Sequence, residues 1–114
     1  MITFFCTGGT FDKIYFDASS EFTIGEPQII PLLQEANISI DYEVRSVLKK
    51  DSLDMSEQDR QLVSDNVLAC SSDKIIITHG TDGMVATAQH LARHDLGNKT
   101  IILVGAMQPA RMRY

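Results

Sequence analysis

Three short apolar runs in this chain each lead directly into a turn that is rich in glycine, threonine or both. The runs and their turns are residues 2–6 with 7–10, residues 75–77 with 78–82, and residues 101–104 with 105–109. Short apolar runs bounded by turn residues are typical of buried strands. If these strands are parallel, the three turns lie along the carboxyl edge of one sheet, where open α/β sheets bind their ligands.

The segments between these runs predict helices and one further strand. Residues 26–36 predict a helix that Pro31 shortens or kinks. Residues 38–48 alternate between apolar and polar side chains and therefore predict a strand. Ser56 and Asp59 resemble a capping box, which marks the start of another helix. The apolar face of that helix is formed by Val63, Val67 and Cys70.

A third helix is expected after residue 82, with Gly97 at its C-terminal end. Its apolar face consists of Met84, Ala88 and Leu91. Residues 11–25 show no regular pattern, and the aromatic side chains among them indicate a lid or a hairpin.

Strands that alternate with helices in this way predict an open parallel sheet of the flavodoxin or Rossmann type, with helices on both faces. We expect residues 1–114 to form a single domain that ends after the fourth strand. In a doubly wound sheet a further helix would cover that strand, so we expect part of one apolar face to be uncovered.

The composition argues against several functional classes. The formal net charge is −5, and an acidic chain without a basic cluster is a poor nucleic-acid binder. The apolar runs fall far short of the ~20 residues that cross a bilayer, and we expect no secretory signal before the first strand. Cys6 and Cys70 are too few for a disulfide scaffold and are predicted to be buried, which fits a reducing cytoplasm.

The first two turns would bring hydroxyl and carboxylate groups together. The Thr10 hydroxyl can attack a carbonyl carbon if a base or a cation lies nearby; the alternative is a tight turn that only feeds a loop. Thr81 and Asp82 follow the middle strand, and an ionised carboxylate there can hold a substrate ammonium group. The alternative is that one of these two residues is the N-cap of the next helix.

Two further residues have both a structural and a functional interpretation. His79 is expected to be a packed, hydrogen-bonded histidine rather than a general base. Ser52 is either a turn former or a hydrogen-bond donor to a substrate carboxylate. The chain lacks the glycine patterns of dinucleotide-binding and Walker A loops, and its cysteine spacing does not suggest a metal site.

Taken together, these turns resemble the signature motifs of bacterial-type L-asparaginases and glutaminase-asparaginases. The matching stretches are Thr7-Gly8-Gly9-Thr10, Thr78-His79-Gly80-Thr81-Asp82 and Val104-Gly105-Ala106-Met107-Gln108-Pro109. The resemblance covers essentially the whole chain but only part of that family's N-terminal domain. It implies hydrolysis of a small amide, L-asparagine or L-glutamine, through a threonine acyl-enzyme. It also implies a homo-oligomer and no metal or organic cofactor.

The resemblance implies roles for individual residues as well. Thr10 matches the nucleophile, and Thr81 matches the second catalytic threonine. Asp82 matches the carboxylate that binds the substrate's α-amino group, and Ser52 matches the serine that binds the α-carboxylate. The other residues expected at the substrate are Gly9, Ala106 and Tyr15.

The chain departs from the family's pattern at several positions. Leu53 stands where relatives carry a polar residue, and Phe22 stands where many carry a tyrosine whose hydroxyl Tyr15 would supply. Gly83 replaces a common threonine, and the family's catalytic lysine lies beyond the last strand seen here. Two alternatives therefore stay open: a non-catalytic amino-acid-binding remnant of the same fold, and a phosphate or nucleotide binder that uses the Gly8-Gly9 turn.

Overall fold

A four-stranded parallel sheet forms the centre of the molecule. The computed structural model describes residues 1–9, 13–16, 21–24 and 27–106, with the backbone alone in the second and third of these ranges. The strands of the sheet are β1 (Ile2–Cys6), β4 (Tyr42–Ser46), β5 (Lys74–Thr78) and β6 (Thr100–Val104). They lie in the order β4-β1-β5-β6, and every neighbouring pair is parallel. The predicted open parallel sheet is therefore confirmed.

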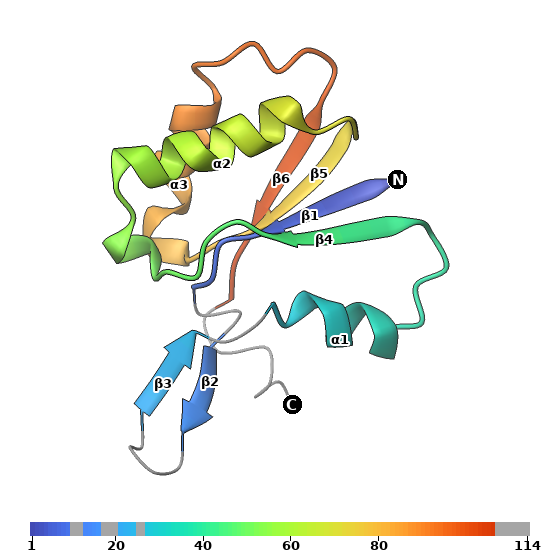
Figure 1. Ribbon diagram of the computed structural model, residues 1–114, viewed down its shortest axis with the longest axis vertical. Helices are drawn as coiled ribbons and strands as arrows, with labels where there is room; N and C mark the ends of the chain where they lie inside the picture. The colour runs from blue at the N-terminus through green and yellow to red at the C-terminus, as the bar shows by residue number, and fades with distance from the viewer. Residues whose placement is uncertain (10–12, 17–20, 25–26, 107–114) are drawn as a thin grey trace.

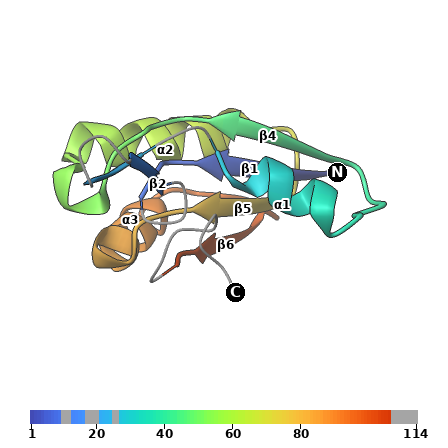
Figure 2. The same ribbon diagram turned by 90° about the horizontal axis from the view of Figure 1, so that it is seen from below.

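Helices cover both faces of this sheet (Figures 1 and 2). Helix α1 (Ile29–Glu35) packs on the face that carries Phe4 and Cys6. Helices α2 (Glu57–Ala69) and α3 (Met84–Leu91) pack on the opposite face, where Phe5 lies in the larger core cluster. Successive residues of a strand point to opposite faces, so β1 contributes to both cores.

The strand order places a topological switch point between β1 and β5. After β1 the chain passes to β4 on one side, and after β4 it crosses to β5 and β6 on the other side. The segments that leave β1 and β5 therefore diverge from adjacent strand ends. In open α/β sheets such a switch point is the usual position of a ligand site.

Helix α1 begins later than residue 26, and its proline causes no break. With Gln28 as the N-cap, Pro31 lies in the first turn, where a backbone N–H has no intrahelical acceptor. The helix therefore loses no hydrogen bond to this proline. Asn37 follows the C-cap with a φ of 55°, and a left-handed residue at this place is a common helix stop.

Strand β4 is shorter than the predicted strand over residues 38–48. Its first residue, Tyr42, pairs with Ile2, the first residue of β1. Ile38 and Ile40 are 42 % and 55 % exposed. Sequence alternation alone could not set this boundary, because the neighbouring strand supplies no pairing partner before Ile2.

The capping box at the start of α2 is confirmed. The Asp59 N–H donates to Ser56 Oγ at 3.2 Å, and the Ser56 N–H donates to Asp59 Oδ2 at 2.9 Å. The hydrogen bond from the Ser56 backbone, with help from the Lys50 ammonium, lowers the pKa of the Asp59 carboxyl. Val63, Val67 and Cys70 are buried, as predicted.

Helix α3 differs from its prediction. A 3₁₀ turn, Thr81–Gly83, precedes it, and it ends at Leu91. Ala88 is exposed, whereas Thr87 and His90 are buried. Polar partners make this possible, because His79 binds Thr87 and Gln61 binds His90. Gly97 does not end the helix; it lies in the connection to β6 with a φ of 61°.

The loop over residues 11–25 contains a hairpin, which was one of the two predicted possibilities. Strands β2 (Lys13–Phe16) and β3 (Glu21–Ile24) pair antiparallel. The hairpin is separate from the main sheet (Figure 1). Residues 13–16 and 21–24 thus form paired strands although their sequence shows no regular pattern.

None of the described helices covers Ile102 of β6 on the α1 face, in line with the expected gap in the helical cover. Ile102 is 52 % exposed there, and an apolar depression of about 200 Å³ opens beside it. It is lined by Ile2, Lys74, Ile75, Ile76, Thr100 and Ile102. None of the described helices is long and apolar enough to span a membrane.

Candidate active site

The turns that follow β1 and β5 meet at the switch point of the sheet. The Thr7 N–H donates to the Thr78 carbonyl at 3.2 Å. Gly9 has a φ of 78°, and a Cβ placed on it would lie only 2.7 Å from the backbone nitrogen of Gly80. Because Gly80 offers backbone rather than a movable side chain there, glycine is required at position 9 by both conformation and space.

Ser52 brings a third segment to the same place. It begins a 3₁₀ turn, Ser52–Asp54, and is only 5 % exposed. Its Oγ accepts a hydrogen bond of 2.9 Å from the Gly83 N–H, and a Cβ on Gly80 would lie 2.5 Å from the same oxygen. Because Ser52 Oγ is the acceptor here, its own hydrogen remains available for an anionic ligand.

The end of β6 supplies a fourth segment. The His79 N–H donates to the Val104 carbonyl at 2.8 Å. A Cβ on Gly105 would lie 2.9 Å from both the His79 carbonyl oxygen and the Thr81 methyl carbon. Ala106 follows Gly105 directly and is half-buried, so the backbone that was expected to border a substrate does lie beside the turn of Thr81.

Thr81 and Asp82 stand at the surface of this junction. Both are exposed, and among the described residues Asp82 forms no ion pair. The N-cap positions of the 3₁₀ turn and of α3 are Gly80 and Gly83, and neither makes a side-chain cap. The alternative that Thr81 or Asp82 is a helix cap is therefore wrong, and both side chains are available for other contacts.

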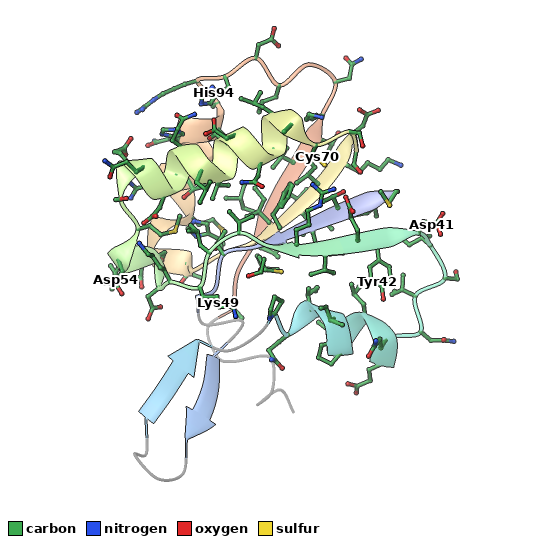
Figure 3. The ribbon with its side chains drawn as sticks, viewed as in Figure 1. Asp41, Tyr42, Lys49, Asp54, Cys70 and His94 are labelled. Carbon is green, nitrogen blue, oxygen red and sulfur yellow. The ribbon has the colours of Figure 1, made fainter. Side chains whose placement is uncertain are left out.

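Some of the predicted site residues lie outside this description. Thr10 and residues 107–109 lie outside the described residues, and Tyr15 belongs to β2, where the backbone alone is described. The structure thus brings Gly9, Ser52, Thr81 and Ala106 to one junction with Asp82. Lys49 and Asp54, which flank Ser52 in the sequence, are labelled in Figure 3 and locate the segment of Ser52 in the molecule.

His79 is a packed histidine, as predicted. It is 0 % exposed; its Nδ1 lies 2.7 Å from the Gly80 carbonyl oxygen and its Nε2 lies 2.7 Å from Thr87 Oγ1. A carbonyl can only accept, which assigns the hydrogen to Nδ1 and makes Nε2 the acceptor of the Thr87 hydroxyl. Burial lowers the pKa of His79, so both ring nitrogens are engaged in a neutral imidazole.

This buried imidazole predicts a pH dependence of stability. The unfolded chain protonates His79 near pH 6.5, whereas the folded chain resists protonation to lower pH. Because the unfolded state then binds more protons, the free energy of unfolding should fall by up to ~1.4 kcal/mol per pH unit below that pH. Urea unfolding between pH 5 and 8 measures this slope. His79→Gln should reduce this slope relative to wild type; an unchanged slope would contradict the assignment.

Two residues with structural roles in the site were not identified from the sequence. Thr7 is fully buried and donates its hydroxyl to the Thr78 carbonyl at 2.8 Å. Gly80 is packed between Gly9 and Ser52. Their positions inside the motifs were visible, but nothing in a single sequence shows which backbones approach one another.

Two lysines in the described part of the chain, Lys50 and Lys99, are engaged away from Thr81 and Asp82. Lys50 Nζ pairs with Asp59 Oδ2 at 2.9 Å. Lys99 Nζ donates to the carbonyls of Cys70 and Ser72. Within the described ranges, moreover, no three histidine, cysteine, aspartate or glutamate residues are placed to hold a metal ion.

Comparison with known proteins gives consistent results. Residues 1–113 match the family described as Asparaginase, N-terminal. The probable periplasmic L-asparaginase of Haemophilus influenzae is 31 % identical over 96 % of this chain and 33 % of its own length. The thermostable L-asparaginase from Thermococcus kodakarensis superposes with a TM-score of 0.83 at 24 % identity, over 98 % of this chain and 35 % of the other.

A second solved structure shows the same relationship. The probable cytoplasmic L-asparaginase from Campylobacter jejuni superposes with a TM-score of 0.79 at 27 % identity, over 96 % of this chain and 36 % of the other. The chain thus spans about a third of the length of these relatives. The shared part contains the whole parallel sheet described above.

Proposed function

The chain belongs to the asparaginase N-terminal family, and from this premise we propose that it hydrolyses the side-chain amide of L-asparagine to L-aspartate and ammonia. The observation that carries the proposal is the meeting of four chain segments around Gly80 at the sheet's switch point. That junction offers the exposed Asp82 carboxylate, which no described residue pairs, the exposed Thr81 hydroxyl, the buried Ser52 hydroxyl and backbone groups within one small region, as an amino-acid amide requires. L-Glutamine, longer by one methylene, is the second substrate.

In this proposal Thr10 is the nucleophile. Its oxygen attacks the side-chain amide carbon, the carbon–nitrogen bond breaks, and ammonia leaves with the proton that the hydroxyl gave up. Water then hydrolyses the ester and regenerates Thr10. Thr81 is the second catalytic threonine, and Tyr15 approaches from the hairpin. The backbone around Gly9 and Ala106 borders the amide.

The amino-acid end of the substrate is held by two other residues. The exposed Asp82 carboxylate pairs with the α-ammonium group. The Ser52 hydroxyl, whose oxygen already accepts from the Gly83 N–H, donates its hydrogen to the α-carboxylate. Because Ser52 and Gly83 are tied to each other, the two binding groups keep a fixed separation.

A non-catalytic amino-acid-binding module is the second candidate. Two observations favour it: Leu53, beside Ser52, is 79 % exposed, and the Lys50 and Lys99 ammonium groups are engaged elsewhere. Such a module would bind aspartate or asparagine through Ser52 and Asp82 without releasing ammonia.

We further propose that residues 1–114 form one domain and that the protein acts in the cytoplasm as a homo-oligomer. Two core clusters on opposite faces of a single sheet support one domain. The thiols of Cys6 and Cys70 are buried and form no disulfide, which is compatible with a reducing compartment. Exposed apolar side chains such as Ile102 offer surface for a subunit contact.

The function is tested by measuring ammonia release and ligand binding on the same protein. The chain is incubated with L-asparagine or L-glutamine, and ammonia is quantified. L-Aspartate is then titrated while the backbone amide signal of Gly83 is followed by NMR. Ammonia from asparagine supports the enzyme, aspartate binding without ammonia supports the binding module, and the absence of both excludes either function.

Leu53 predicts a gain of binding on substitution. An exposed leucine next to Ser52 offers no hydrogen bond to a polar ligand, so Leu53→Gln should strengthen aspartate binding. One added hydrogen bond contributes about 0.5–1.5 kcal/mol, which is roughly a two- to tenfold change in Kd. Leu68→Gln, at an exposed leucine of α2, is the matched control. Calorimetric Kd values that agree between the two variants would place Leu53 outside the ligand's reach.

A further inference from the structure

The hydroxyl of Thr7 joins the two turns that meet at the switch point. Thr7 is 0 % exposed, and its Oγ1 donates to the Thr78 carbonyl at 2.8 Å. The Thr7 backbone N–H donates to the same oxygen at 3.2 Å. Two donors from one residue to one acceptor fix both the position and the rotation of the first turn against the end of β5.

Thr7 also connects this pair of turns to the segment of Ser52. Its carbonyl accepts a hydrogen bond of 3.1 Å from the Lys50 N–H, two residues before Ser52. Beyond Thr7 come Gly8 and Gly9, with φ values of 93° and 78°. Glycine adopts these positive φ values without strain, and Gly9 packs against the Gly80 backbone, so Thr7 anchors the start of a turn whose end is also held against β5.

We propose that Thr7 is a positioning residue of this site: its hydroxyl sets the spacing between the turn that leads to Thr10 and the turn that carries Thr81 and Asp82. This inference rests on the proposed function, because the spacing matters most to a reaction between groups on the two turns. Reacting atoms must lie about 3–3.5 Å apart, and a displacement of ~1 Å can cost ~10²-fold in rate.

The proposed binding residues, Ser52 and Asp82, depend less on the hydrogen bond from the Thr7 hydroxyl to the Thr78 carbonyl. Ser52 and the turn of Asp82 are joined directly by the hydrogen bond from the Gly83 N–H to Ser52 Oγ. Loss of the Thr7 hydroxyl should therefore lower the rate of ammonia release much more than the affinity for aspartate. A residue that only stabilised the fold would not produce that separation.

Thr3 provides a matched control within the same segment. It lies in β1, is also 0 % exposed, and its hydroxyl donates to Glu43 Oε1 at 3.0 Å and shares a hydrogen bond of 2.8 Å with Ser72 Oγ. It stands at the amino end of the strand, away from the turns. Thr3→Val therefore removes a buried hydroxyl near the amino end of β1, whereas Thr7→Val removes one just past its carboxyl end.

The test compares Thr7→Val, Thr7→Ser and Thr3→Val in the full chain, with ammonia release, aspartate Kd and urea unfolding measured for each. We expect Thr7→Val to release ammonia about 10- to 100-fold more slowly than Thr3→Val, with aspartate Kd within about threefold of wild type. Thr7→Ser, which keeps the donor, should remain close to wild type. Equal rates in the two valine variants, or equal losses in Thr7→Ser and Thr7→Val, would overturn the proposal.

Backbone NMR separates failure of this inference from failure of the proposed function. If the wild-type chain releases no ammonia, the catalytic proposal fails, but the link between the turns is still measurable. Thr7→Val should then shift the amide signals of residues 79–83, and Thr3→Val should leave them in place; unshifted signals in both would overturn the positioning role. If Thr7→Val does not fold, Thr7→Cys, which offers a weaker donor, takes its place in both measurements.

Discussion

Thr10→Ala is expected to abolish ammonia release from L-asparagine while the chain still folds. The alanine removes the only atom that the proposed mechanism uses to form the acyl-enzyme, and loss of a nucleophile typically costs on the order of 10⁴–10⁶ in rate. Aspartate binding should persist, because the proposal assigns the amino-acid end of the ligand to Ser52 and Asp82. Ammonia release under saturating asparagine, aspartate Kd and the urea midpoint measure the three parts of this expectation.

Two companion variants make the result specific to the hydroxyl of residue 10. Thr10→Ser keeps a nucleophilic oxygen and should retain measurable turnover. Thr100→Ala removes an exposed threonine at the start of β6, at the opposite edge of the sheet, and should match wild type. Wild-type turnover by Thr10→Ala would remove this residue from the mechanism, whatever the family relationship implies.

The local sequence pattern was sufficient to predict a strand or helix boundary where that boundary depends on nearby residues. The strand over residues 2–6 has the predicted bounds, because the short apolar run ends at turn residues. The capping box of Ser56 and Asp59 was recognisable because its two partners are three residues apart. Such signals need no knowledge of the rest of the fold.

The local pattern did not predict the length of a strand or the buried face of a helix where a residue far away in the sequence determines it. Strand β4 could not be bounded from its own alternation, since its length follows from pairing with β1. The buried face of α3 was misjudged because Thr87 is polar and is buried only with the help of His79 from another element. Apolar periodicity cannot reveal a polar residue whose partner lies elsewhere in the chain.

The candidate site, too, could be predicted in part from local pattern, while the rest depends on contacts between distant residues. Parallel strands that end in similar turns were enough to expect Thr81 and Asp82 beside the turn of Gly9 at one edge. The contacts that set their spacing were not predictable, because Thr7 and Thr78 are 71 positions apart and Ser52 and Gly83 are 31 apart. The candidate functional groups could be predicted from single motifs, whereas the distances between those groups depend on contacts between pairs of motifs.

Gly9→Ala is expected to destabilise the fold strongly and to prevent aspartate binding. At a φ of 78° an alanine costs about 1–2 kcal/mol. Its Cβ would also lie 2.7 Å from the nitrogen and 2.9 Å from the Cα of Gly80, and separating the two turns adds roughly 1–3 kcal/mol. Urea unfolding should therefore show a loss of about 2–5 kcal/mol.

Gly97→Ala separates the two contributions to that loss. Gly97 also has a positive φ, 61°, but a Cβ there would meet nothing within 4 Å. It should lose only the conformational part, about 1–2 kcal/mol, and leave aspartate affinity unchanged. Subtracting the two losses cancels the backbone term and leaves the contact between Gly9 and Gly80. Similar losses in the two variants would mean that the turns can move apart freely, and a site that depends on their spacing could not then hold its substrate in one geometry.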